Sequence, residues 1–129
     1  MKHLIFLALL AAAPMAQAQP AVDENAEFLL TEMDGAPYEG RSTMVFPAEG
    51  RVAGQGPCNR FMGRAEWGED GAASFGPLAS TMMACPDLDR EKALLHALGE
   101  VTRIEMTDDG FVLTTAAGDA LRYSRESAD

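Results

Sequence analysis

The chain has few of the side chains that most often carry out chemistry. Its 129 residues include two cysteines, two histidines and one tryptophan. His3 lies in the apolar N-terminal segment, which leaves His96 as the one histidine of the remaining chain. No serine stands between the glycines of a nucleophile elbow, and two cysteines with one histidine lack the fourth spaced ligand of a zinc site. The composition therefore argues against a serine hydrolase and against a structural zinc centre.

Basic side chains are scarce relative to acidic ones, with ten Lys and Arg against 20 Asp and Glu. The formal net charge is −10, and it becomes −11 if the N-terminal segment with Lys2 is removed. Such a charge repels phosphate backbones, and no basic stripe with interleaved aromatics offsets it locally. The acidic residues are spread along the chain, which favours solubility over a metal cage. We therefore expect no nucleic-acid partner, no metal and no cofactor.

No apolar run is long enough to cross a bilayer as a permanent helix. The run at residues 4–13 follows the basic Lys2 and precedes the small residues Ala16 and Ala18. This order is typical of a secretory signal peptide with cleavage after Ala18. A buried N-terminal helix is the alternative, but nothing amphipathic accompanies the run. No cysteine follows the cleavage point, so a lipid anchor is not supported, and the sequence predicts a periplasmic or secreted protein.

The rest of the chain is predicted to form one domain. Residues 19–26 are polar and lack an apolar period, which is typical of a flexible leader. The domain then covers residues 27–125, and residues 126–129 form a C-terminal tail. Without its first 18 residues the chain keeps 111 residues, a length that supports one hydrophobic core and leaves no room for a second. We expect a monomer.

Short apolar segments with β-branched or aromatic members follow one another along the domain and predict strands. Turn residues separate them, among them Asp34-Gly35, Asp70-Gly71 and Asp109-Gly110, which offer the positive φ that tight hairpins need. The expected strands lie at residues 28–33, 43–46, 51–53, 61–67, 73–75, 101–107, 111–115 and 121–124. The last three form a meander whose core-facing side chains are predicted to be Ile104, Met106, Phe111, Leu113, Leu121 and Tyr123.

One helix is predicted, at residues 86–98. Pro86 suits its first turn, Asp87 and Asp89 complement the positive end of the helix dipole, and Gly99 can end it. Its apolar stripe consists of Leu88, Leu94, Leu95 and Leu98. His96 falls beside the stripe and is expected to be partly exposed. The fold class is therefore α+β: a mostly antiparallel, curled sheet or small open barrel of about eight short strands, packed with one helix.

Cys58 and Cys85 are predicted to form a disulfide, because two cysteines in a small exported domain most often pair. A reactive thiol is the alternative, but it requires a base. His96 lies about three helical turns beyond Cys85, too far for contact within one helix. The glycine-rich segment around Cys58 lacks the Lys-Ser/Thr ending of a phosphate-binding loop. We interpret it as a structural loop in which Pro57 fixes a bend and Asn59 hydrogen-bonds its own loop.

Methionine is abundant, with eight in the chain. Thioether sulfur is a soft, oxidisable ligand, so copper or peroxide chemistry is one hypothesis. No regular cluster of methionine with histidine supports it, and methionine as irregular core filler is the preferred interpretation. Met82 and Met83, beside Cys85, are expected to alternate, one inward and one outward.

Two spaced motifs resemble the META domain family, which includes the HslJ-type heat-shock proteins of bacterial envelopes. They are "GPCNRFMG" at residues 56–63 and "GPLASTMMACPD" at residues 76–87, and the similarity extends over residues 27–124. This sequence departs from the family pattern at two positions. Pro57 is an extra residue between Gly56 and Cys58, and Phe28 stands where a tryptophan is common in the family. The matching positions beyond the cysteines are carried over as structural ones: Gly56, Asn59, Phe61, Gly63, Ser80, Thr81, Met83 and Pro86.

The resemblance implies a compact, mostly β fold and an association with envelope stress or secretion, and it brings no catalytic residues. We therefore expect a non-enzymatic exported stress or interaction protein with an unknown envelope partner. The alternative is a carrier of a small apolar ligand or lipid, or a secretion-associated protein similar to pilot proteins. The carrier's pocket would be lined from within the curled sheet by Met44, Phe46, Leu113 or Tyr123.

Overall fold

The structure is a computed structural model, and it describes residues 23, 24 and 26–126. Within this part of the chain there are ten strands, one α-helix and one 3₁₀ turn, η1 (Glu69–Gly71). The helix is α1 (Leu88–Gly99). The strands are β1 (Phe28–Met33), β2 (Ala36–Pro37), β3 (Thr43–Val45), β4 (Arg51–Gln55), β5 (Arg60–Trp67), β6 (Ala73–Phe75), β7 (Ala79–Ser80), β8 (Val101–Met106), β9 (Gly110–Thr115) and β10 (Ala120–Arg125).

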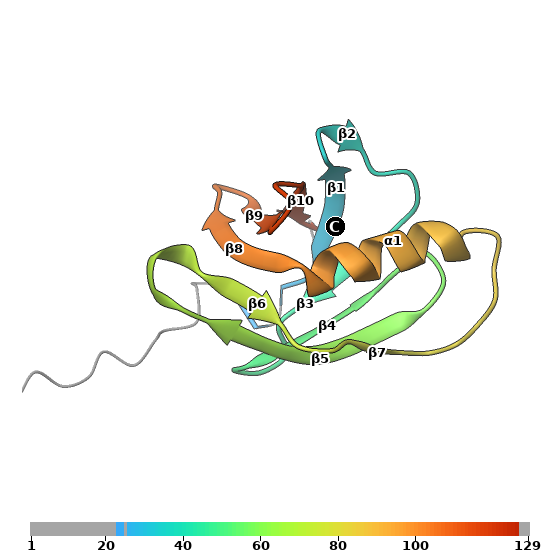
Figure 1. Cartoon of the computed structure of the whole chain (residues 1–129), viewed down its shortest axis with the longest axis horizontal. Coiled ribbons are helices and arrows are strands. Elements are labelled where there is room, and N and C mark those ends of the chain that lie inside the picture. The colour runs from blue at the N-terminus through green and yellow to red at the C-terminus, as the bar shows by residue number, and fades with distance from the viewer. Residues whose placement is uncertain (1–22, 25, 127–129) are drawn as a thin grey trace, which may run out of the picture.

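The strands form one antiparallel sheet that curls until its two ends meet. Their order is β6-β5-β4-β3-β1-β10-β9-β8, while β2 pairs with β1 and β7 pairs with β5. At the seam, an isolated bridge joins Ala72 to Arg103, and the Arg103 guanidinium donates a hydrogen bond to the Asp70 carbonyl at 2.9 Å. Figure 1 shows α1 lying over the concave side of the curled sheet. The predicted α+β class, a mostly antiparallel curled sheet or small open barrel packed with one helix, is confirmed, and the sheet is nearly closed.

The core fills the space between the curled sheet and the helix. Phe46, Phe111 and Tyr123 are completely buried. Phe111 stacks on Tyr123 with ring centroids 5.0 Å apart and meets Phe46 edge-on at 5.7 Å. Leu94 and Leu98 enter this core from α1 and are also fully buried. Aromatic rings therefore occupy the centre of the barrel and one face of the helix closes it.

The C-terminal meander forms as predicted, with one exception. Ile104 is buried, whereas Met106, two residues further along β8, is 42% exposed. Met106 occupies the last position of the strand, at the hairpin that leads to β9. A register shift between Val101 and Arg103 adds a residue to β8, so Val101 and Ile104 both face the core despite their odd spacing.

The helix begins two residues later than predicted. Pro86 and Asp87 form a turn, and Leu88 is the first helical residue. The buried stripe also differs from the prediction, because Leu88 and Leu95 are only half-buried. The buried positions are Glu91, Leu94, Ala97 and Leu98. A carboxylate therefore occupies a place on the core-facing side of the helix, and this placement was not predicted.

Most of the predicted tight turns have the expected backbone. Asp34 and Gly35 both adopt positive φ, 54° and 81°, in the hairpin that joins β1 to β2, and Asp70 at φ 56° does the same in η1. Gly110 was predicted to supply a positive φ and does not. It opens β9 instead, where an added Cβ would overlap the carbonyl of Tyr123 on β10. This glycine is required by close strand approach.

The signal peptide predicted at residues 1–18 lies outside the described residues, and the domain boundaries stay predictions. Near the N-terminal boundary, Ala26 is buried and the Asp23 carboxylate lies 2.9 Å from the Arg125 guanidinium of β10.

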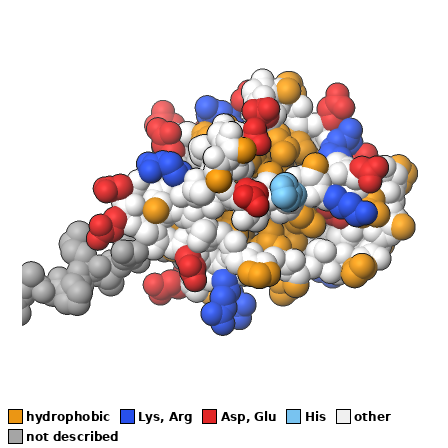
Figure 2. Space-filling view, viewed as in Figure 1, with side chains coloured by type: hydrophobic (Ala, Val, Ile, Leu, Met, Phe, Trp, Pro, Cys, Tyr) orange, Lys and Arg blue, Asp and Glu red, His pale blue; other side chains and the backbone are white. Residues whose placement is uncertain are grey.

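Figure 2 shows acidic side chains dispersed over the visible face without a continuous patch. Within the described part of the chain, no helix is both long enough and apolar enough to cross a bilayer.

Candidate functional site

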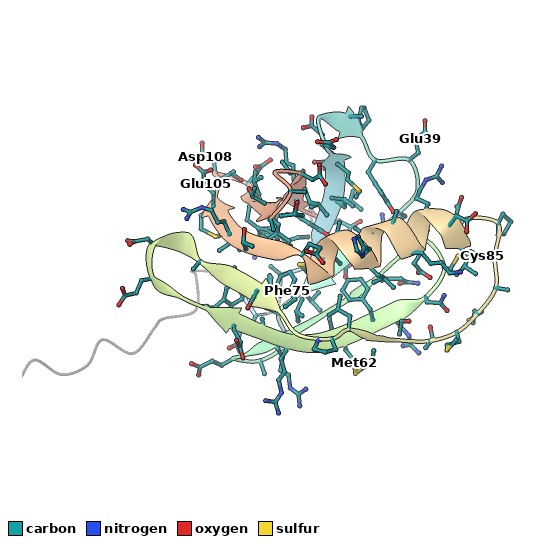
Figure 3. All side chains as sticks on the ribbon, viewed as in Figure 1. Glu39, Met62, Phe75, Cys85, Glu105 and Asp108 are labelled. Carbon is teal, nitrogen blue, oxygen red and sulfur yellow. A yellow bond between two sulfur atoms is a disulfide. The ribbon has the colours of Figure 1, made fainter. Side chains whose placement is uncertain are left out.

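Two loops from distant parts of the sequence meet at the beginning of α1. One joins β4 to β5 and contains Cys58 and Asn59, and the other joins β7 to α1 and contains Thr81, Met83 and Cys85. A disulfide links Cys58 to Cys85, with 6.0 Å between their Cα atoms. Cys85 is labelled in Figure 3 beside the N-terminal end of α1. The cysteines predicted to pair are joined in the structure, and they bring both sequence motifs into one place.

The Asn59 side chain is the centre of this junction. Its Nδ2 donates to the Met83 carbonyl at 3.1 Å and to Glu91 Oε2 at 2.6 Å. Its Oδ1 accepts from the Thr81 hydroxyl at 2.9 Å and from the Met83 backbone N–H at 2.7 Å. An asparagine side chain has two donors and two acceptor sites, so all four are used. The prediction that Asn59 hydrogen-bonds its own loop is wrong, because its amide connects the other loop and the helix.

Glu91 anchors the junction from the helix. Its Oε1 accepts the backbone N–H of Asn59 at 2.5 Å and that of Cys58 at 3.0 Å, while Oε2 accepts the Asn59 side chain. The Glu91 side chain is only 2% exposed, and no ion pair within the described residues involves it. A buried carboxylate is costly unless hydrogen bonds satisfy it. Here three N–H groups take the place of a cation.

Gly56 makes room for this carboxylate. It is buried at the end of β4, and its N–H donates to the Asn59 carbonyl at 2.8 Å, which closes the turn. A Cβ added at Gly56 would overlap Glu91 Oε1 and lie 3.1 Å from its Cγ. The glycine of the first motif is therefore required by the position of Glu91 and not by a positive φ.

One phenol, Tyr38, lies close to the junction, and a second, Tyr123, lies near Tyr38 in the core. Burial raises the pKa of Tyr38 to about 12, with the charges of Glu91 and Asp87 acting in the same direction and Arg90 opposing them. Burial also raises the pKa of Tyr123, and the nearby Tyr38 adds to this shift. Both hydroxyls are buried without a hydrogen-bond partner among the described residues. Neither phenol is prepared for proton transfer near neutral pH.

The other motif positions lie on the strands that lead into the junction. Phe61 is a core residue on β5, 2% exposed. Gly63, further along β5, permits close approach of the chain before β7, since an added Cβ would lie 2.7 Å from Leu78 Cδ2. Ser80 on β7 and Pro86 before α1 are exposed. These four positions therefore do not share a site with Asn59 and Glu91.

The methionines correct two predictions. Met82 and Met83 are both exposed, at 95% and 65%, so they do not alternate between core and solvent. The loop before α1 is irregular at these positions, and strand alternation does not apply to it. Met44 is a fully buried core residue as predicted, but Met62 is 61% exposed. Core filling therefore explains only some of the methionines.

Sequence reasoning missed Glu91 and Tyr38. Glu91 lies three and seven residues before Leu94 and Leu98, on the same face of the helix. An acidic residue at a position that the apolar period assigns to the core is a usable signal for a buried polar partner. Tyr38 follows the two-residue strand β2 and carries no comparable pattern.

The junction offers no reactive group in this state. Both cysteines are in the disulfide, the Asn59 and Glu91 polar atoms are occupied, and His96 is exposed on the outer side of α1. Among residues 23, 24 and 26–126, no three His, Cys, Asp or Glu side chains converge as metal ligands would. The arrangement is suited to holding two loops against a helix.

A groove of about 580 Å³ lies on the outer face of the sheet, over β3, β4, β5 and β7. Val45, Ala53, Met62 and Ala79 contribute side chains to its lining, together with Arg60. Strand alternation places these apolar side chains opposite the buried Met44, Val52 and Phe61. In Figure 3, Met62 lies on the side of β5 that faces away from α1.

Fold and junction define a class of protein: a small, nearly closed antiparallel barrel crossed by one helix, with a disulfide joining two loops at the start of that helix. A model of the META domain family matches residues 21–128. The chain therefore belongs to the META domain family, and the resemblance noted in the sequence is confirmed.

Two solved structures are similar to this chain. An NMR structure of a protein from Burkholderia xenovorans has a TM-score of 0.64 and 25% identity, covering 89% of this chain and 97% of that one. A second NMR structure has a TM-score of 0.61 and 25% identity, covering 78% of this chain and 89% of that one. A comparison with curated proteins found no match.

Proposed function

We propose that this protein is an exported, non-enzymatic interaction protein of the cell envelope with a role in envelope stress. Three features support the proposal. The N-terminal residues have the order of a signal peptide, the Cys58–Cys85 disulfide suits an oxidising compartment, and the chain belongs to the META domain family. In this proposal the mature protein begins after Ala18 and residues 27–125 form its single domain.

One observation carries the non-enzymatic part of the proposal: the motif residues use their polar atoms on one another. Asn59 makes four side-chain hydrogen bonds, and Glu91 accepts three. A catalytic group must be within hydrogen-bond reach of a substrate and free to change its protonation or bonding. Asn59 and Glu91 are buried and use these polar atoms on the junction itself, which is how a structural clamp works. The remaining motif residues then act as structural positions around it.

The carrier alternative receives less support from the interior. Met44, Phe46, Leu113 and Tyr123, the side chains predicted to line its pocket, are all fully buried, and three aromatic rings pack directly against one another there. Protein interiors packed in this way leave no space for an acyl chain without displacement of core side chains. The large groove described above lies on the outside of the sheet. A binding role is therefore better placed on the surface.

Export, the staple and stress protection can be tested in one series in the native host. A strain without the gene would be complemented by the full chain, by a chain lacking residues 2–18, and by the Cys58→Ser/Cys85→Ser double variant. We expect the full chain to appear in the envelope or medium, cleaved after Ala18 and with both cysteines blocked to alkylation. We also expect it to restore growth under heat or detergent stress.

The chain lacking residues 2–18 is the matched control, because it keeps the whole domain. Equal complementation by this cytoplasmic form, or free thiols in the exported protein, would contradict the proposal. The purified domain should also leave its bound partner chemically unchanged, as judged by the partner's intact mass before and after incubation.

A further inference from the structure

The outer groove has a pattern of apolar and basic side chains that its structural role does not explain. Val45 pairs with Ala53, Ala53 with Met62, and Met62 with Ala79. The four side chains therefore form one row that runs across four neighbouring strands. Strands lie about 4.8 Å apart, so the row is about 14 Å long. Met62, near its centre, is 61% exposed.

Arginines flank the row on both sides. Arg60 and Arg64 lie two residues before and after Met62 on β5, and on the same face. Positions two residues apart on a strand are separated by about 7 Å. Arg60 therefore lies about 7 Å from Met62 on one side of the apolar row, and Arg64 lies about 7 Å from it on the other side. Arg51 on β4 is paired directly with Arg64. All three arginines are exposed.

These arginines lack the ion pairs that their surroundings could supply. The chain has twice as many acidic as basic residues, yet no ion pair within 4.0 Å among its described residues involves Arg51, Arg60 or Arg64. Like charges directly opposite each other on a sheet are destabilising. The Arg51–Arg64 pair is therefore a cost to the isolated domain. A ligand that brings negative charge to this face would offset the repulsion between Arg51 and Arg64.

From this charge pattern we infer that the outer face of β3, β4, β5 and β7 docks an acidic amphipathic helix of a partner protein. The inference rests on the proposed interaction function and names the chemistry of the partner. A row about 14 Å long matches nine or ten helical residues at 1.5 Å each. Such a helix presents an apolar stripe with carboxylates along both flanks, which complements an apolar row with arginines along both flanks.

Other occupants fit this face less well. A fatty acid or lipid carries its negative charge at one end, whereas the basic groups here stand on both sides of the row. An extended peptide alternates its side chains between two faces, so apolar and acidic groups would point in opposite directions. Glu27, which also lines the groove, lies 4.0 Å from Arg41 at the β1 end. Its charge is therefore partly balanced within the domain.

The first test uses a designed 14-residue helical peptide as the probe, with leucines along one stripe and glutamates on both flanks. A control peptide keeps the leucines and replaces the glutamates with lysines. Binding to the isotope-labelled mature protein is followed by NMR at low salt. We expect the acidic peptide to shift amides of residues 43–45, 51–55, 60–64 and 79–80, and to bind more weakly as salt is raised. The basic peptide should not bind.

Charge reversal on the protein provides the matched variants. Arg60→Glu/Arg64→Glu should weaken acidic-peptide binding by about tenfold or more, since two attractive contacts become repulsive. Arg103→Glu/Arg122→Glu, which makes the same change in net charge elsewhere, should weaken it by less than about threefold. Denaturation curves confirm that each variant is folded. Equal binding of both peptides, equal loss in both variants, or shifts outside these strands would overturn the inference.

Two further outcomes would assign this face to another occupant, and each would also overturn the inference of an acidic helix. One is that decanoate or phosphatidylglycerol vesicles, and not the peptide, shift the same amides. The other is that the protein self-associates in sedimentation and Arg60→Glu/Arg64→Glu abolishes the self-association.

Photo-crosslinking in the native envelope separates this inference from the proposed function. A benzoylphenylalanine at position 62 should crosslink a partner, and one at position 105 should not. A partner captured only from position 105 overturns the docking face and leaves the function standing, whereas no partner from either position contradicts both.

Discussion

The Glu91 carboxylate on α1 and Asn59 in the β4–β5 loop are joined by two short hydrogen bonds in the interior of the domain. Glu91 Oε1 accepts the Asn59 backbone N–H at 2.5 Å, and Oε2 accepts its side-chain amide at 2.6 Å. Both residues are buried, at 2% and 4% exposure. Hydrogen bonds to an ionised group are stronger than neutral ones. The pair therefore joins the β4–β5 loop, which carries Cys58, to α1, which follows Cys85.

Replacement of Glu91 should destabilise the domain strongly. In Glu91→Gln, an NH₂ group replaces one of the two carboxylate oxygens, and this group cannot accept a hydrogen bond from the N–H donors around it. We therefore expect a loss of about 1–3 kcal/mol in the free energy of unfolding. Glu91→Ala should cost about 3–5 kcal/mol, because it leaves buried donors without partners. Urea denaturation measures both, with the exposed Glu105→Gln as the control. A Glu91→Gln variant as stable as Glu105→Gln would show that the carboxylate is not required.

Asn59→Asp should give a pH-dependent defect. The new carboxylate would replace the amide that donates to Glu91 Oε2 at 2.6 Å, so two carboxylates would share one site. Like charges at this distance favour protonation of the pair. The native variant then binds more protons than its unfolded chain, and its stability should rise as pH falls from about 7 to about 5. Asn59→Ser, which adds no charge, should show no such rise in denaturation midpoints over the same range.

Much of this fold could be predicted from the sequence because its signals are local. In the β9–β10 hairpin, large apolar residues recur at every second position of each strand, and the segment after Pro86 has a helical period. Phe111, Leu113, Leu121 and Tyr123 were predicted as core residues and are completely buried. The disulfide follows from the number of cysteines and the predicted compartment. The family resemblance added the motif positions but did not explain why those residue types are needed.

The details that escaped prediction depend on contacts between distant segments. Glu91 is separated from Asn59 by 32 positions, so no local pattern reveals that its carboxylate is satisfied. Gly110 sits in a turn-like sequence, but its role comes from the backbone of Tyr123 on the neighbouring strand. Met82 and Met83 lie in a loop without a period. For Glu91 and Gly110 the long-range neighbour, and not the residue's own propensity, decides the outcome.

Loss of the disulfide should lower stability without changing the fold. Cys58 and Cys85 are 27 positions apart, and closure of such a loop restricts the unfolded chain by about 3–4 kcal/mol in the entropy model. We expect Cys58→Ser/Cys85→Ser to lose about 2–5 kcal/mol in the free energy of unfolding. Reduction of the wild-type protein should give the same shift in urea midpoint. If reduction left the midpoint unchanged, the bond would not be a structural staple.

Tyr123→Phe should be neutral or slightly stabilising. The Tyr123 side chain is fully buried and its hydroxyl has no hydrogen-bond partner among the described residues. Removal of an unsatisfied polar atom from a core relieves a desolvation cost. Thermal unfolding near pH 7 should therefore show an equal or higher Tm. Tyr123→Leu, which also removes the ring that stacks on Phe111 at 5.0 Å, is the contrast and should lose about 1–3 kcal/mol. A clear loss for Tyr123→Phe would indicate that the hydroxyl is satisfied in solution.

The same phenols predict an alkaline limit to stability. Burial raises the pKa of Tyr38 to about 12 and raises that of Tyr123 as well. A phenol in the unfolded chain ionises near pH 10. Above that pH the unfolded chain loses protons that the native protein keeps, so stability is full below about pH 10 and falls as the pH approaches 12. Urea midpoints between about pH 8 and 11 should show this fall. Tyr123→Phe should make it shallower, and an unchanged pH profile in that variant would contradict the assignment.

Gly56 and Glu91 should be energetically coupled. A Cβ at position 56 would overlap Glu91 Oε1, so Gly56→Ala must displace the carboxylate from the N–H groups of Cys58 and Asn59. We expect a loss of about 2–4 kcal/mol for Gly56→Ala, since those donors lose a charged acceptor. In a Glu91→Ala background the overlap is absent, and Gly56→Ala should then cost less than about 1 kcal/mol. A double-mutant cycle of urea denaturation curves measures the difference. Additive losses would show that Gly56 is needed for its backbone alone, whereas strong coupling would assign the first motif's glycine to the space that the buried carboxylate occupies.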